Sequence, residues 1–456
     1  MSRLFSLEEE ETQQVQIPVP GWLDRWLDFM DSYPLRVLVL IFILAVTLSL
    51  VLNLESLPPA LNAGENDTWW TIALNLIHGH GYSLCLTRYF PFCGPSNQIT
   101  AAREPLPVLL FAGVALLSGE SLWAATAIEL IIYLTILILI YFLTREWAGT
   151  RVALLAAFLW AIYIHAIELI PQVSGDLLAT LFVSVGILFT MRARRTRRVR
   201  DWLIAGTSLG LAVLSRSGTL VIAAVVIGGV VFEAWRGRFS LKEIIVPGLI
   251  LSSLMILLMS PWLIRNKIVF GRPILGSSLI GYNLYRHNHM LGTNESFHYV
   301  GAKEGLAAIQ ELIARRTDLN GMENEAQMDS IYRGEALQLI RTHPIHYVLL
   351  SAYRFFPLWF NWGYSEAYGV QTKREDYMIM FYQAILLILA LVGLRGNLAQ
   401  TWPLWGSILA ISLTYMAVDS QLLYLTPVMP LVMSLSARGG ISLLEKFIPS
   451  KLRTVS

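Results

Sequence analysis

The stretch VLVLIFILAVTLSLVLNL, residues 37–54, decides the fold class, and it contains no charged residue. An uncharged apolar run of about 18 residues is long enough to cross the hydrocarbon core of a bilayer as a helix. A second run, AATAIELIIYLTILILIYFL at residues 124–143, carries a single charged residue, Glu129. These runs predict a polytopic, all-α membrane protein.

The composition of the whole chain favours the same class. Of the 456 residues, 55% are hydrophobic and only 14% are charged, and the mean hydropathy is +0.56. A soluble domain carries about 25% charged residues. The formal net charge of +2 says little by itself, and the expected partners include membrane lipids but no nucleic acid.

The positions of Lys and Arg predict how the chain threads the membrane, because short basic loops lie on the cytoplasmic side. The strongest basic segment is MRARRTRRVRD at residues 191–201, and the acidic N-terminus lacks the pattern of a cleavable signal peptide. Placing the basic loops inside gives ten crossings with both termini in the cytoplasm. The predicted spans are residues 35–54, 121–143, 152–170, 173–191, 203–215, 218–234, 245–263, 378–395, 401–418 and 422–437.

Two apolar segments, residues 104–119 and 347–364, do not fit as crossings. The first is too short for a bilayer core at about 1.5 Å per residue, and counting it would place the Arg-rich loop outside. We expect both to be helices at the outer surface. The expected organisation begins with a cytoplasmic tail and surface helix at 1–34 and a transmembrane module at 35–263, which has an outward catalytic loop at 55–120. An extracytoplasmic helical segment follows at 264–346, then an interfacial helix and transmembrane helices at 347–440, and a cytoplasmic tail at 441–456.

The chain has two cysteines, Cys85 and Cys93, and both fall in the first outward loop. Outside the cytoplasm such a pair favours a disulfide. The alternative is two unpaired thiols in a reducing compartment.

Two carboxylates, Glu65 and Asp67, follow the first span at its outer end. Alone, acidic residues in a loop usually indicate only solubility. Further ionisable or helix-breaking residues occur in REPLPVLL (103–110), SGDLLA (174–179) and GLAVLSRSG (210–218), each at the outer end of a predicted span or surface helix. Polar groups at such places mark a substrate path more often than packing.

In their order along the chain, these motifs resemble those of the GT-C membrane glycosyltransferases. The nearest branch is that of the protein O-mannosyltransferases and lipid A aminoarabinose transferases, glycosyltransferase family 39-like, and the resemblance covers most of residues 60–440. Each motif is weak alone, but six in this order are a specific signal. The matching positions are Glu65, Trp69, Ala73, Leu76, Gly79, Gly81, Tyr82, Pro105, Pro107, Asp176, Gly210 to Arg216, Pro261, Trp262, Arg265, Asn266, Phe270, Gly271, Tyr424, Pro427 and Pro430.

The chain also departs from the family pattern. The first acidic residue is usually Asp, and here it is Glu65. The Arg that usually precedes the C-terminal Tyr is replaced by Leu423, with Gln421 nearby. Beside the first-loop proline, where the family often has Lys or His, this chain has Arg103 and Glu104. The sequence therefore leaves the sugar and the acceptor open.

The resemblance implies a GT-C-type bundle that transfers a sugar from a polyprenyl-phosphate carrier to an extracytoplasmic acceptor, with inversion at the anomeric carbon. The attacking group needs a base. Glu65 is expected to be that base, and Asp67 to cap the following helix or orient the acceptor. The leaving phosphate needs cations, and the candidates are Arg216, Arg265 and Arg103.

Other residues carried over from the resemblance would bind substrate: Asp176, Trp69, Tyr82, Tyr424, Gln421 and Asn266. We expect no cofactor and no metal, because the His pairs in HGH (78–80) and RHNH (286–289) lack partners at a typical zinc spacing. The expected location is a bacterial inner membrane, with the active site facing the periplasm. A transporter or flippase of a lipid-linked or anionic substrate is the alternative, although no inverted repeat is visible.

The two first-loop carboxylates can be separated by conservative substitution. Glu65→Gln keeps size and hydrogen bonding but removes basicity, so turnover should fall roughly 100-fold or more, with little loss of carrier binding. Asp67→Asn should cost less, because Asn also caps helices well. Turnover and carrier affinity of the two variants check this, and the reverse order of effects would exchange the two roles.

Overall fold

The structure is a computed structural model that describes residues 21–53, 68–87, 89–93, 98–236, 241–293, 296–368 and 373–447. Most of these residues are helical, and within the described ranges the only β-pairing is an isolated bridge between Ser83 and Ile99. The prediction of an all-α membrane protein is confirmed.

The long helices are uninterrupted apolar segments, as the sequence predicts. By length and composition, six of the described helices can cross a membrane, and a bent pair with a 52° angle can make a seventh. The long helices are α2 (Pro34–Leu52), α5 (Leu122–Ala148), α8 (Asp176–Thr196), α11 (Leu241–Phe270), α18 (Lys373–Leu394) and α20 (Met429–Phe447), and the bent pair is α6 (Thr150–Ala161) with α7 (Ile164–Glu168) and η2 (Ile170–Gln172).

The remaining predicted spans coincide with shorter or broken helices. These are α9 (Val199–Ser215), η3 (Ser217–Thr219) with α10 (Leu220–Trp235), and α19 (Trp402–Val418). The span that contains α20 begins with η5 (Leu422–Val428). All ten predicted spans therefore fall on helices, while the count of ten crossings stays a prediction. Several boundaries differ from the prediction: α5 continues to Ala148, α8 to Thr196 and α11 to Phe270. Along α11 the Arg265 guanidinium lies over the rings of Tyr82, Trp262 and Phe270, so this charge does not end the helix.

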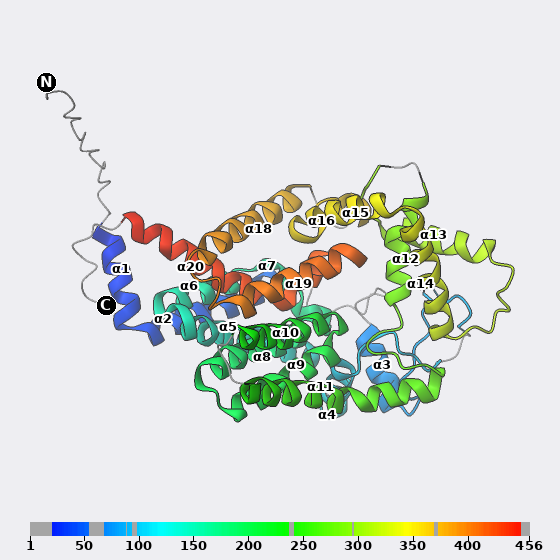
Figure 1. Cartoon of the computed structure of the whole chain (residues 1–456), viewed down its shortest axis with the longest axis horizontal. Helices are drawn as coiled ribbons and strands as arrows, with labels where there is room; N and C mark the ends of the chain where they lie inside the picture. Colours follow the sequence, from blue (N-terminus) through cyan, green and yellow to red (C-terminus); the bar gives the residue numbers. More distant parts are fainter. Residues whose placement is uncertain are drawn as a thin grey trace, which may run out of the picture.

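Other helices form two groups at opposite ends of the molecule (Figure 1). α1 (Gly21–Ser32) lies at one end, where Arg151 Nε donates a 2.7 Å hydrogen bond to Asp31 Oδ2. At the opposite end gather α12 (Ile280–Asn288), α13 (Ala302–Arg315) and α14 (Glu325–Thr342). The remaining short helices are α3 (Thr68–Ile77), α4 (Pro105–Ser118), η4 (His289–Gly292), α15 (Pro344–Tyr353), α16 (Phe355–Phe360) and α17 (Tyr364–Tyr368).

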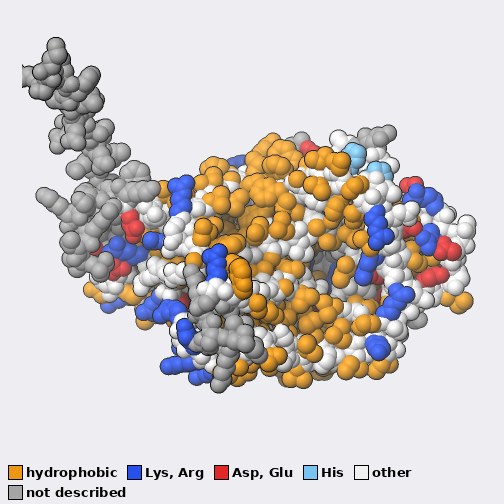
Figure 2. Space-filling view, in the orientation of Figure 1, with side chains coloured by type: hydrophobic (Ala, Val, Ile, Leu, Met, Phe, Trp, Pro, Cys, Tyr) orange, Lys and Arg blue, Asp and Glu red, His pale blue; other side chains and the backbone are white. Residues whose placement is uncertain are grey.

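The surface agrees with a membrane-embedded middle. Figure 2 shows hydrophobic side chains over the centre of the visible face and charged side chains gathered toward both ends. Leu117 on α4 is 92% exposed and Ile268 on α11 is 78% exposed. In water such exposure would be costly, whereas lipid chains cover it without loss.

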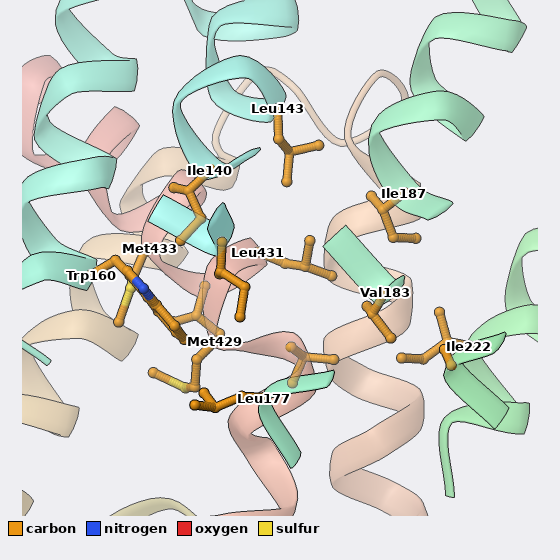
Figure 3. Packing of buried hydrophobic residues seen from close by; sticks show 14 of the residues in the cluster. Ile140, Leu143, Trp160, Leu177, Val183, Ile187, Ile222, Met429, Leu431 and Met433 are labelled. Atoms are coloured by element: carbon orange, nitrogen blue, oxygen red, sulfur yellow. The ribbon is translucent and has the colours of Figure 1, made fainter. Parts of the chain in front are cut away.

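The interior is closely packed by large side chains from α5, α6, α8, α10 and α20, including Trp160, Ile187 and Leu431 (Figure 3). Within lipid the hydrophobic effect does not drive helices together, so close van der Waals packing must do so. Glycines permit it where α18 meets α20. A Cβ on Gly393 would lie 2.0 Å from the carbonyl oxygen of Leu435, so any larger residue there would force the two helices apart.

The predicted topology can be tested with two exposed positions, Arg200 at the start of α9 and Lys303 on α13. Single cysteines at these positions, in a variant with Cys85 and Cys93 replaced by Ser, should react with a membrane-impermeant maleimide from opposite sides. Only position 303 should be labelled in intact cells. Labelling of both positions from the same side would contradict the model of large outward loops.

Candidate active site

One cavity collects three of the charged residues expected at the site, Arg103, Asp176 and Arg216. It measures about 340 Å³ and lies between the segment before α4, the start of α8, the break between α9 and η3, α12, and the junction of α19 with η5. Among the described residues, three basic and three acidic side chains line it. They are Arg103, Arg216, Arg286, Glu104, Asp176 and Asp419.

The centre of the cavity is the ion pair between Asp176 and Arg216. Asp176 is the first residue of α8, and Arg216 stands in extended backbone where α9 ends after Ser215. The Arg216 guanidinium lies 2.6 Å from Asp176 Oδ1, and the two side chains are only 12% and 1% exposed. A buried charge without a partner is strongly destabilising, so each residue holds the other in place.

Aromatic rings fix the other side of Arg216. Its guanidinium lies 5.0 Å from the centre of the Tyr424 ring, and the rings of Tyr415 and Tyr424 stack 4.3 Å apart. The Tyr424 hydroxyl donates a 2.5 Å hydrogen bond to Asp419 Oδ2. Tyr424 and Asp176, both expected substrate-binding residues, are therefore brought to the same cation.

Asp419 connects this centre to α12. Its Oδ1 lies 2.9 Å from His287 Nε2 on α12, and both side chains are buried. Arg354, which follows α15, donates to the His287 carbonyl, to Asn288 Oδ1 at 3.1 Å and to the Ala417 carbonyl at 3.2 Å. This buried network holds α12 against the C-terminal end of α19.

The segment before α4 supplies a second cation and its supports. Arg103 lies over the Trp69 ring at 4.4 Å and donates a 2.6 Å hydrogen bond to Thr68. The Glu104 carboxylate accepts hydrogen bonds from the Ser217 amide at 2.9 Å and the Ser217 hydroxyl at 2.8 Å. Glu104 thus fixes the residue directly after Arg216.

Several expected site residues lie elsewhere. Tyr82 donates to the Arg103 carbonyl at 2.9 Å, and burial together with the nearby Glu104 raises the pKa of Tyr82, so that its phenol stays a donor. Arg265 donates to the carbonyls of Thr100 and Tyr82, and Asn266 donates to the Ile274 carbonyl. These three residues brace the cavity wall without lining it.

The remaining candidates are placed as follows. Trp69 and Gln421 line the cavity. Cys85 and Cys93 form a disulfide with Cα atoms 5.7 Å apart. Glu65 and Asp67, the expected base and cap, lie outside the described residues. Within the described ranges no group of three or more His, Cys, Asp or Glu side chains is placed to hold a metal ion.

Asp419 and His287 were not among the site residues expected from the sequence. A signal for Asp419 existed, because it is an ionisable residue between two predicted spans and only two residues before Gln421. The pairing of His287 with Asp419 spans more than a hundred residues of chain. No local pattern in the sequence marks such a contact.

Comparison with known proteins agrees with this fold. Residues 102–264 match the family model described as dolichyl-phosphate-mannose-protein mannosyltransferase. The chain also resembles the archaeal oligosaccharyltransferase AglB from Archaeoglobus fulgidus, solved in complex with an inhibitory peptide and a dolichol-phosphate. The TM-score is 0.56 at 16% identity, with 92% of this chain and 51% of that chain covered. A comparison with curated proteins found no match.

A second solved structure of the Archaeoglobus fulgidus oligosaccharyltransferase, in the apo form, gives a TM-score of 0.54 at 16% identity and covers 92% of this chain and 51% of that chain. The chain thus spans about half the length of the oligosaccharyltransferase chains that it matches. At this identity the likeness establishes the fold, and it confirms the GT-C-type bundle that the sequence motifs implied.

The Asp419 network makes a prediction about pH. Burial alone would raise the pKa of Asp419, but His287 and Arg286 outweigh it, and the pKa falls from its ordinary 3.8 to about 2. A pKa lowered by folding contributes stability that is complete above the unfolded value and is lost as the pH falls toward about 2. The difference corresponds to about 2 kcal/mol.

Thermal unfolding between pH 5 and pH 2 checks this, with pH values chosen to bracket the two pKa values. The unaltered protein should lose about 2 kcal/mol more stability over this range than Asp419→Asn, which cannot titrate. Equal losses in the two proteins would contradict an ionised, stabilising Asp419.

Proposed function

We propose that the chain is a membrane glycosyltransferase that moves a sugar from a polyprenyl-phosphate carrier to an extracytoplasmic acceptor by a single inverting displacement. The observation that carries the proposal is the buried Asp176–Arg216 pair in a cavity at the ends of apolar helices. A bacterial inner membrane, with the cavity open to the periplasm, is the location that the basic loops favour.

The cations of the cavity suit a phosphate leaving group. Arg216 is held from two sides, by Asp176 and by the Tyr424 ring, and Arg103 lies over Trp69. Guanidinium groups bind phosphate oxygens through paired, charge-assisted hydrogen bonds. In a site shielded from water, such fixed charges stabilise negative charge as it develops on the leaving oxygen.

The carboxylates that line the cavity are poor candidates for the base, because each is already engaged. Asp176 pairs with Arg216, Glu104 accepts two hydrogen bonds from Ser217, and Asp419 meets His287 and Tyr424. This supports Glu65 as the base that takes the proton of the attacking group. Asp67 is then the residue that caps α3 or orients the acceptor.

Trp69 and Gln421 are suited to hold the sugar. Both line the cavity, and the Trp69 indole N–H is buried with no hydrogen-bond partner among the described residues. A buried donor without a partner is costly, and a sugar hydroxyl would satisfy it. The polar cavity wall therefore complements the uncharged part of a glycosyl phosphate.

A second cavity, of about 690 Å³, suits the prenyl chain of the donor. It lies between α10 and α19, and apart from Glu233 and Arg236 its lining is mostly apolar. The two cavities meet along the same helix pair. On α10, Val221 lines the polar cavity, and Val225, one helical turn further, lines the apolar one. On α19, Thr414 lines the polar cavity and its neighbour Leu413 lines the apolar one. A phosphate at Arg216 would therefore continue into a tail lying between α10 and α19.

The proposal is tested by the binding of two probes, undecaprenyl phosphate and the much shorter geranyl phosphate, to the protein in nanodiscs. Arg216→Gln removes a charge-assisted contact of about 1.5–3 kcal/mol, so it should weaken both probes roughly tenfold or more. Arg103→Gln, which leaves the Asp176–Arg216 pair intact, is the milder companion. The melting temperatures of both variants check that a loss of affinity does not come from unfolding.

The tail groove has its own variant and control. A Cβ on Gly228 meets nothing within 4 Å, so Gly228→Leu projects a side chain into the groove without a clash. The added side chain would occupy part of the space of the tail and remove van der Waals contacts between the tail and α10 and α19. Undecaprenyl phosphate alone should therefore bind more weakly. Gly248→Leu on α11, equally unobstructed, should change neither probe. Failure of the unaltered protein to bind either probe would refute the proposal.

A further inference from the structure

The turn that leads into Asp176 has an unfavourable backbone conformation. Val173 has φ 48° and ψ 60°, in the left-handed region, and its side chain is 4% exposed. Residues branched at Cβ rarely adopt this conformation, because their side chain collides with the backbone. Something outside the turn must therefore hold it, and such conformations concentrate at functional sites.

The turn is also closely confined by its neighbours. A Cβ on Gly175 would lie 2.7 Å from the Ser215 carbonyl oxygen and 2.8 Å from Cγ of Pro107. The turn therefore presses against the end of α9, directly before Arg216, and against the first turn of α4. A shift of this turn would move Asp176 relative to the cation that it pairs with.

The group that holds the turn is Glu129, the single charged residue in the apolar core of α5. It is fully buried, at 0% exposure, and it does not line the cavity. Its Oε1 accepts a 3.1 Å hydrogen bond from the Ser174 amide, and the Ser174 hydroxyl lies 3.4 Å from the Asp176 amide as its acceptor. Its other oxygen, Oε2, has no hydrogen-bond partner among the described residues.

We propose that Glu129 is a positioning residue: its carboxyl oxygen holds the Ser174 amide, keeps Val173 in the left-handed conformation, and so presents Asp176 to Arg216. The inference rests on the proposed function, because it assigns Glu129 to the same phosphate site. Glu129 acts through its hydrogen bond to the Ser174 amide and not through a negative charge. An ionised carboxylate that is fully buried with no cation beside it would be costly.

A merely structural role makes different predictions from a positioning role. If Glu129 only filled space in α5, its removal would lower stability without any dependence on the conformation of Val173. If Glu129 acted through its charge on Arg216, Glu129→Gln would be as damaging as Glu129→Ala. Neither alternative links Glu129 to the backbone of residue 173.

A double-mutant cycle separates these cases. The variants are Glu129→Ala, Glu129→Gln, Val173→Gly and the combination of Glu129→Ala with Val173→Gly, and the probe is undecaprenyl phosphate. Glycine adopts the left-handed conformation without the steric penalty, so Val173→Gly should make the turn independent of Glu129. We expect Glu129→Ala to weaken binding roughly tenfold in the natural background and less than about twofold in the Val173→Gly background.

Glu129→Gln keeps an oxygen acceptor for the Ser174 amide, so it should bind the probe within about twofold of the unaltered protein. Equal losses from Glu129→Ala in both backgrounds, or a Gln variant as weak as the Ala variant, would overturn the proposal. The same cycle measured by melting temperature gives a second reading that needs no ligand. If the unaltered protein did not bind the probe, the proposed function would fail, while coupling in melting temperature would still decide whether Glu129 holds the turn.

Discussion

The buried ion pair between Asp176 and Arg216 is the constraint on which the rest of the site depends. Two opposite charges buried in a helical bundle are tolerated only if both are held in one geometry. The surrounding elements supply that geometry: Glu129 and Gly175 fix the turn before Asp176, while Glu104 and Tyr424 fix the two sides of Arg216. The chain is not helical just before Asp176 and at Arg216, and these two breaks also help to hold the pair in one geometry.

The arrangement also explains why a polar and an apolar cavity share one helix pair. A lipid-linked donor is an amphiphile, and its phosphate lies where its charged head meets its apolar tail. α10 and α19 line the polar cavity near Arg216 and the apolar groove beyond it. α10 and α19 are short, with 16 and 17 residues, and residues next to their ends line the polar cavity. Helix breaks within a membrane are tolerated where they line a cavity.

The sequence predicted most of the fold and part of the site, and the difference has a physical cause. Apolar runs and basic loops are local, so the helices and the break at Arg216 could be predicted, as could Asp176 at the start of α8. Arg265 matches its family motif equally well, yet it lies among aromatic rings and donates to backbone carbonyls. The direction of that side chain, like the contact between His287 and Asp419, is set by helices brought together only in the folded chain.

We propose that the chain removes a sugar from its carrier instead of moving the intact carrier lipid. To test this, the purified protein in nanodiscs is incubated with lipid-linked sugars extracted from host membranes and a periplasmic acceptor fraction, and the lipids are followed by mass spectrometry. One glycosyl prenyl phosphate should disappear as free prenyl phosphate and a glycosylated acceptor form. A binding protein that leaves every lipid-linked sugar intact would contradict it.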